Sequence, residues 1–290
     1  MFDAFIIIII SLLLIAIMYP VLNIISISFS SAAPVAKGDV GIWPKEFTLD
    51  AYKFVLKDPF IYKGYRNSII YALGSTAIML LFTSLMAYPL TNKDFVIKKF
   101  ITIYLTITMF FSGGMIPAYL LMIKLNLVDT VWVMMIPGCV GAYNVFMFRT
   151  FFNSIPAEMK EAALIDGAND IVILFRIILP LSKALLAVFA LFGIVGSWNS
   201  WFNGLIYLKD QNRYPLQLIL RNYLYVLDAA ALQARAGSSQ VNSSVLFQTR
   251  TNPTSVKMGA IVVTILPIML VYPFLQKYFV KGVMIGAIKG

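Results

Sequence analysis

The chain has 290 residues, of which 60% are hydrophobic and 12% carry a charged side chain. This composition excludes a water-soluble globular protein and predicts an integral membrane protein, with residues 1–290 forming one membrane domain of several helices. The net charge of +10 would point to nucleic acid in a soluble protein. Here the basic residues lie in loops and at helix ends, so membrane lipid is the simpler partner and no nucleic acid is expected.

Six apolar runs, each close to the roughly 20 residues that a spanning helix needs, predict about six transmembrane helices and an all-α fold. The runs cover residues 5–29, 67–90, 101–123, 131–148, 184–208 and 258–275. The first run is longer than the apolar part of a secretory signal and follows Asp3 instead of a basic segment, so we expect a retained helix. The two longest connections between the runs are residues 30–66 and 209–257.

The sequence lacks the groups that several other classes of membrane protein need. It contains no histidine and no Gly-x-x-x-x-Gly-Lys-Ser/Thr phosphate loop, so we expect no metal site, no catalytic residue and no ATPase site in this chain. The apolar runs hold no ionisable side chain away from their ends, which argues against a proton- or sodium-driven transporter.

Uncharged polar and aromatic side chains gather mainly in the fifth run. Trp and Asn together suit a sugar, because aromatic rings stack on its C–H faces and amides bond to its hydroxyl groups. Asn199 and Asn203 are four residues apart and are expected on one face of a helix. We predict a substrate path made of Asn23, Tyr143, Asn144, Trp198, Asn199, Trp201 and Asn203. An aromatic belt with amide bonds between helices explains the same residues equally well.

A polar island at 154–181 interrupts the apolar runs. Pro156 suits a first helical turn, Glu158 and Glu161 lie near the positive N-terminal end, and Gly167 is a natural residue after the C-terminus. The predicted helix is too short to span a bilayer. It is therefore either a docking helix for another protein or an interfacial helix without a partner.

The island carries a spaced motif. It consists of Glu161-Ala162-Ala163, three further residues, Gly167, nine further residues and then Ile177-x-Leu179-Pro180. This pattern resembles the EAA loop in the membrane subunits of bacterial ATP-binding-cassette importers. The resemblance implies the type I importer permease fold, with a cytoplasmic coupling helix that sits in a cleft of an ATPase subunit. The residues that it assigns to ATPase coupling are Glu158, Glu161, Ala162, Ala163, Asp166, Gly167, Leu179 and Pro180.

Most of the chain is similar to the second permease subunit of the maltose importer, and the Trp-Asn segment also resembles that of sugar-importer permeases. This resemblance implies import of oligosaccharides by alternating access. It is closer to the branch of these permeases that imports oligosaccharides derived from polysaccharides, including uronate oligomers such as alginate fragments. The implied partners are a related second permease subunit in a heterodimer, two cytoplasmic ATPase subunits that hold ATP and Mg, and an extracytoplasmic solute-binding protein. An ion-coupled secondary transporter, an exporter subunit and a non-transporting membrane scaffold are the alternatives.

The Lys and Arg counts do not decide the orientation in the membrane. The resemblance implies a multi-pass protein of the bacterial cytoplasmic (inner) membrane with both termini in the cytoplasm and the loops 30–66 and 209–257 on the extracytoplasmic side. Residues 234–253 are polar and rich in Ser and Asn, and they either form a surface loop or reach the binding protein. The Gly-rich tail at 281–290 is either a frayed terminus or a contact with the ATPase subunits. Basic residues that could attract an acidic cargo from outside are Arg66, Arg213, Arg221, Arg235, Arg250 and Lys257.

Overall fold

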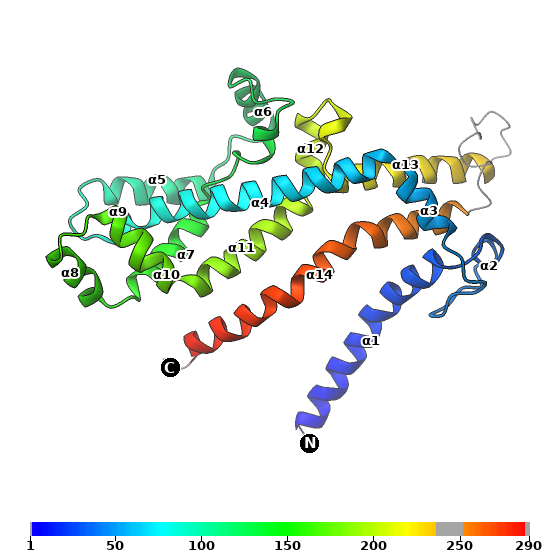
Figure 1. Ribbon diagram of the computed structural model, residues 1–290, viewed down its shortest axis with the longest axis horizontal. Helices are drawn as coiled ribbons and strands as arrows, with labels where there is room; N and C mark the ends of the chain where they lie inside the picture. Colours follow the sequence, from blue (N-terminus) through cyan, green and yellow to red (C-terminus); the bar gives the residue numbers. More distant parts are fainter. Residues whose placement is uncertain (1, 236–251, 288–290) are drawn as a thin grey trace. The chain divides into compact units, whose positions relative to one another are not determined.

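Helices dominate the computed structural model, which describes residues 2–235 and 252–287 (Figure 1). The longer helices are α1 (Phe2–Ser28), α4 (Pro59–Ala87), α5 (Lys98–Phe110), α6 (Met115–Lys124), α7 (Ala142–Asn153), α11 (Lys183–Trp198), α13 (Leu216–Arg235) and α14 (Pro253–Ala287). The shorter ones are α2 (Ala32–Ala36), α3 (Asp50–Lys57), η1 (Pro89–Thr91), η2 (Val131–Met134), α8 (Ala157–Ile165), α9 (Asp170–Ile173), η3 (Leu174–Ile178), α10 (Leu179–Leu181), α12 (Trp201–Tyr207) and η4 (Gln211–Arg213). Apart from an isolated bridge between Ser30 and Phe47, the described ranges contain no β-structure, which confirms the all-α prediction.

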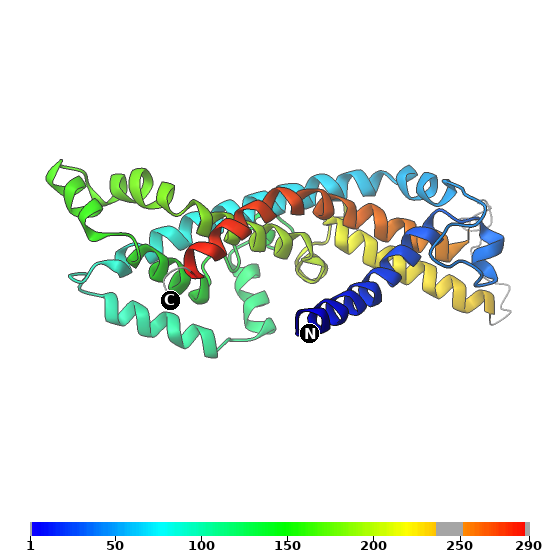
Figure 2. The ribbon, with the colours of Figure 1, turned by 90° about the horizontal axis from the view of Figure 1, so that it is seen from below.

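The chain divides into two compact units. The first comprises residues 1–65 and 216–269, and the second comprises residues 66–215 and 270–290. The second unit contains most of α4 and all of α5 to α12. Within it, α8 and α9 lie at one end, and α6 and α12 lie away from them (Figures 1 and 2).

Three described helices are long and apolar enough to cross a membrane, namely Phe2–Ser28, Pro59–Thr91 and Pro253–Leu270. Two pairs of helices meet the same test together but are bent, by 120° between α5 and α6 and by 82° between Asp170–Leu181 and α11. The described residues therefore provide three candidate spans, or five if each bent pair is one span, where the sequence predicts about six.

Glycine explains why two predicted spans are not single helices. The run at 101–123 is interrupted after Phe110, and Gly114 there has φ +83°, a conformation that glycine adopts without strain. The run at 131–148 forms η2, then an irregular stretch at 135–141, and becomes α-helical only at Ala142. Pro137 cannot donate a helical hydrogen bond and Gly138 has φ +76°, so the helix cannot continue through them.

The fifth run breaks without proline or glycine at the break itself. α11 ends at Trp198 and α12 begins at Trp201, so the expectation that Asn199 and Asn203 share one helix face is wrong. The Asn199 side chain donates to the carbonyl of Val195 at 3.0 Å, and the Trp201 N–H turns back to the carbonyl of Asn199 at 2.9 Å. Such a local side-chain bond competes with the helical pattern and ends the helix.

A hydrophobic core holds the second unit together and reaches into the polar island. Phe148 packs edge-on against Phe152 and Phe189, with ring centroids 5.8 and 5.0 Å away. The same cluster includes Ala163 of α8 and the buried Ile173, Leu174 and Ile178 of the segment that follows. The island is thus a packed part of this unit.

Candidate functional site

The predicted short helix is α8, and the structure confirms its main features. It has nine residues and starts directly after Pro156, with Glu158 in the first turn. At about 1.5 Å per residue it is far too short to span a membrane. Gly167 follows its C-terminus with φ +80°, as a left-handed glycine after a helix does.

One face of α8 is exposed and combines charge with apolar surface. Four exposed residues lie on this face, because their spacings of three, one and three residues bring them to the same side of a helix: Glu158, Glu161, Ala162 and Ile165. Ile165 is 87% exposed, which is unusual for a large apolar side chain at the end of a short helix. The exposed isoleucine beside two carboxylates leaves this face available for contact with another protein.

The opposite side of α8 is anchored to the end of α4. The ammonium group of Lys160 lies 3.4 Å from the Thr91 hydroxyl and 5.6 Å from the centre of the Tyr88 ring. The Tyr88 hydroxyl donates to Asp170 at 3.2 Å, which connects the start of α9 to the same point. Burial lowers the pKa of Lys160 below its usual value, consistent with a side chain enclosed by this contact. These contacts hold α8 and the start of α9 against the end of α4.

The second part of the island is a bent helical segment. Asn169 caps α9, since its side-chain oxygen accepts from the Val172 N–H at 2.9 Å. A π-helical turn at Leu174–Ile178 follows, then Leu179, which packs against the core, and the exposed Pro180. Of the coupling residues predicted from the sequence, Asp166 and Gly167 are exposed after α8, whereas Ala163 is buried.

The second unit also contains a polar cavity of about 210 Å³ that is open to the surface. Its hydroxyl and amide groups come from Ser75, Thr76, Ser197, Ser200 and Asn203. Of the predicted substrate-path residues, only Asn203 lines it. Sequence reasoning missed Ser75 and Thr76, although two adjacent hydroxyl side chains inside an apolar run are a visible signal.

The other predicted path residues lie elsewhere. Asn23 donates to the carbonyls of Val40 and Gly41 at 3.0 Å each and so holds a loop of the first unit. Trp198 is buried at the end of α11, and Trp201 packs edge-on against Phe202 at 5.5 Å. Tyr143 and Asn144 begin α7, where the Tyr143 ring is exposed, and Asn199 bonds within its own chain segment as described above.

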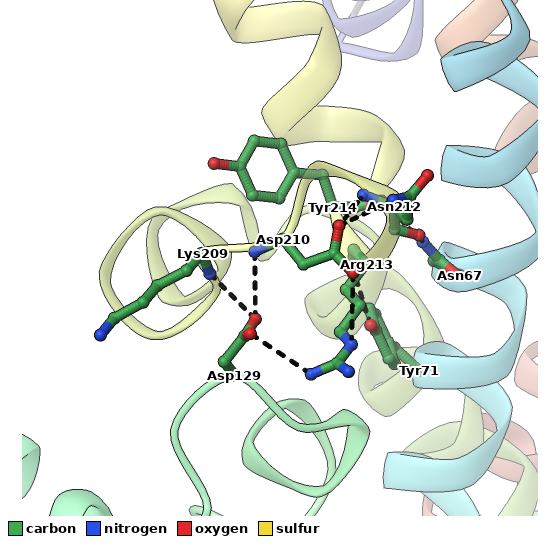
Figure 3. A network of polar contacts seen from close by, with 8 residues as sticks. All are labelled: Asn67, Tyr71, Asp129, Lys209, Asp210, Asn212, Arg213 and Tyr214. Carbon is green, nitrogen blue, oxygen red and sulfur yellow. Dashed lines mark hydrogen bonds and ion pairs between the residues drawn. The ribbon is translucent and has the colours of Figure 1, made fainter.

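A polar clamp, centred on Asp129, joins two segments far apart in the sequence (Figure 3). The Asp129 carboxylate accepts the backbone N–H groups of Lys209 and Asp210 at 3.0 and 3.1 Å and lies 3.4 Å from the Arg213 guanidinium. Arg213 also approaches Asp210 at 3.8 Å. No sequence signal pairs these residues, because the contact depends on the tertiary fold.

α4 supports the clamp from the other side. The Asn67 side chain donates to the carbonyls of Asn212 and Tyr214 at 2.7 and 3.1 Å, and the Tyr71 hydroxyl donates to the carbonyl of Arg213 at 2.8 Å (Figure 3). Both α4 side chains bond to backbone carbonyls of the short helix η4 or of Tyr214, which follows it. The clamp therefore fixes the connection between α12 and α13 to α4.

Asp129→Asn is expected to lower the free energy of unfolding by about 1–2 kcal/mol at neutral pH, because it removes the charge that three donors share. Burial alone raises the pKa of Asp129, but the N–H groups of Asp210 and Lys209 and the charge of Arg213 outweigh it and hold the pKa below its usual value. This stabilisation is present above the unfolded pKa of about 3.9 and is lost as the pH falls through the lower folded value. Thermal unfolding of the wild-type and Asp129→Asn proteins between pH 3 and 7 should show a difference in stability that becomes smaller only at the acidic end. The exposed Asp94→Asn change is the control, and an equal effect there would contradict the role of Asp129.

A short exposed helix fixed to the core and a polar cavity among apolar helices are features expected of the membrane subunit of a transporter. The chain belongs to the family "Binding-protein-dependent transport system inner membrane component", whose model matches residues 79–285. This membership confirms the expected ATP-binding-cassette importer permease, a multi-pass inner-membrane protein that works with an ATPase and a solute-binding protein, and nothing supports the alternative classes.

Individual relatives agree with the family over nearly the whole chain. Protein LplC of Bacillus subtilis is 41% identical, covering 93% of this chain and 89% of the relative. The polygalacturonan/rhamnogalacturonan transport system permease YtcP of the same organism is 35% identical, covering 93% and 92%. A crystal structure of a bacterial ABC transporter involved in the import of the acidic polysaccharide alginate contains a chain that is 31% identical, with a TM-score of 0.87 and 96% of each chain covered. The fold is therefore the type I importer permease fold.

Proposed function

We propose that this chain is the permease subunit of an importer of acidic oligosaccharides derived from polysaccharides. The observation that carries the proposal is α8, whose exposed face offers Glu158 and Glu161 while its other side is fixed to α4 and the core. The choice of cargo is supported by two relatives, since one is named for polygalacturonan and rhamnogalacturonan and the other for alginate.

The proposed assembly pairs this chain with a related second permease subunit, two cytoplasmic ATPase subunits and an extracytoplasmic solute-binding protein. ATP and Mg bind to the ATPase subunits, because the sequence of this chain contains no phosphate loop. α8 and both termini lie in the cytoplasm in this arrangement. The Asp129 clamp then lies on the extracytoplasmic side, since it joins connections at the ends of the predicted spans opposite to α8.

Transport proceeds by alternating access. Closure of the ATPase dimer moves the two coupling helices together, and α8 passes this movement to α4 through Lys160 and to the core through Ala163. Because a packed core moves as a body, the bundle rotates and exchanges an inward-open cavity for an outward-open one. ATP supplies the free energy, so the cavity needs no ionisable group.

Few of the predicted outer cations are available for an acidic cargo. Arg213 is paired with Asp129, and Lys257 lies 2.9 Å from Asp228. Arg221 covers the ring of Tyr225 at 4.6 Å, and Arg66 is exposed at the start of the second unit. The side chains of Arg235 and Arg250 lie outside the described residues. Recognition of the carboxylates is therefore assigned mainly to the solute-binding protein.

The purified chain is expected to hydrolyse no ATP by itself. Hydrolysis should appear only with the ATPase subunits and should rise when a loaded binding protein is added. Proteoliposomes with the complete assembly should take up galacturonate and mannuronate oligomers in preference to maltotriose, measured as ATP-dependent accumulation. Hydrolysis by an ATPase-free preparation of this chain, or preferential uptake of maltotriose, would contradict the proposal.

A further inference from the structure

We propose that the polar cavity in the second unit is a subsite for an uncharged, hydroxyl-bearing part of the cargo, with Thr76 as a hydroxyl ligand. The inference rests on the proposed function, because it takes the cargo to be an oligosaccharide. The cavity lies between α4, the end of η2 with the irregular stretch at 135–141, and the break between α11 and α12. All of these elements belong to the second unit.

Thr76 brings a buried hydroxyl group without a partner among the described residues to the lining of the cavity. It is only 5% exposed, and its hydroxyl oxygen has no hydrogen-bond partner among the residues that the structure describes. The residue lines the cavity, and a Cβ placed on Gly193 in the facing helix would lie 2.8 Å from this oxygen. A buried hydroxyl without a partner costs free energy, and a hydroxyl group of the cargo would remove that cost.

Two irregular backbone segments reach the same cavity. Pro137, Gly138 and Cys139 come from the stretch between η2 and α7, and Ser200 comes from the break before α12. Non-helical backbone at membrane depth is tolerated where it is buried in protein or lines a water-filled cavity, because its polar groups need partners. Both breaks therefore add polar backbone near a place where a polar ligand would be bound.

The lining selects the chemistry of the ligand. The described lining contains no Asp, Glu, Lys, Arg or His, so the subsite favours a neutral group over a carboxylate. Three thioether side chains, Met79, Met134 and Met135, form an apolar wall beside the hydroxyl and amide groups. A sugar ring has this division between C–H faces and hydroxyl edges. The volume of about 210 Å³ is below the roughly 300–1,000 Å³ of sites for whole ligands, which fits one part of an oligosaccharide.

Thr76→Val tests the hydroxyl group with almost no change of shape. In the complete assembly we expect uptake of a galacturonate trimer to fall about threefold to tenfold, the range for one lost hydrogen bond to the cargo. The thermal stability of the variant should be equal or higher, because the change removes an unpartnered buried hydroxyl. A purely structural role predicts a loss of stability instead.

Thr83→Val is the matched control. Thr83 lies on the same helix, is 0% exposed and also carries a hydroxyl without a partner among the described residues, but it does not line the cavity. Its replacement should leave uptake at the wild-type level. Equal uptake by both variants would overturn the subsite while leaving the transport function intact, whereas a wild-type assembly that takes up no oligosaccharide would remove the function and the subsite together.

Cys139 provides a second, independent measurement. It is the single cysteine of the sequence and lines the cavity, so N-ethylmaleimide reports on this place alone within the chain. We expect the galacturonate trimer, delivered by the binding protein during turnover, to slow the alkylation of Cys139, with weaker protection in Thr76→Val. An alkylation rate that the trimer does not change, or a thiol that is already inaccessible in the assembly without cargo, would overturn the proposal.

Discussion

Glu161→Lys is expected to reduce uptake more than about tenfold while the chain is still made and inserted into the membrane. Glu161 is exposed on the face of α8 that is free of contacts with the core. Reversal of its charge replaces an attraction by a repulsion at the ATPase surface, and like charges at an interface cost several kcal/mol, where about 1.4 kcal/mol is already a factor of ten. ATP-dependent uptake in membrane vesicles, normalised to the amount of inserted protein, measures the effect.

Asp94→Lys is the control for this charge reversal. Asp94 is an exposed carboxylate on the predicted inner loop between α4 and α5, outside the polar island. It should retain uptake near the wild-type level. Normal uptake by Glu161→Lys, or an equal loss in both variants, would contradict a specific role of the α8 face.

Gly167→Val is expected to abolish coupling through the backbone. Gly167 has φ +80°, and a non-glycine residue in the left-handed region costs roughly 1–2 kcal/mol, with β-branched side chains the least tolerated. A Cβ at this position meets no atom within 4 Å, so the strain is conformational and not a clash. The chain relieves it by turning the segment after α8, which displaces the docking face. ATPase activity should lose its stimulation by the loaded binding protein, and uptake should fall to background.

Gly38→Val separates strain from position. Gly38 has φ +71° and equally open surroundings, but it follows α2 in the first unit. A comparable loss of thermal stability with normal coupling is expected there. If both glycine variants lose uptake to the same extent, the effect comes from general destabilisation and the coupling role of the turn after α8 is wrong.

The polar island was predictable because its signals are local. Pro156, the acidic first turn and Gly167 define α8 within one or two residues, and Asn169 marks the start of α9 as its cap. Each of these features depends on neighbours in sequence and not on the rest of the fold. The spacing of the motif then gave the family, which the comparisons confirm.

The cavity was less predictable, because hydropathy alone treats an apolar run as one helix. Gly114 and the Pro137-Gly138 pair signalled two of the breaks, but the break at Asn199 depends on a side chain that bonds to the Val195 carbonyl. Each break changes which side chains face the interior, so Asn203 lines the cavity whereas Trp198 and Trp201 do not. The Asp129 clamp depends on residues distant in sequence and carries no local signal.

The central claim is that α8 docks on an ATPase subunit, and a photo-cross-link from Ala162 tests it most directly. In a Cys139→Ser background, Ala162→Cys places a benzophenone maleimide on the exposed face of α8, and Ala36→Cys places it on an exposed position of α2. Adducts formed in native membranes are identified by mass spectrometry, and uptake is measured on the same variants before labelling. We predict that Ala162→Cys forms an adduct with an ATPase subunit and that Ala36→Cys forms none. An active transporter in which the Ala162 position yields adducts only with lipid would contradict the account.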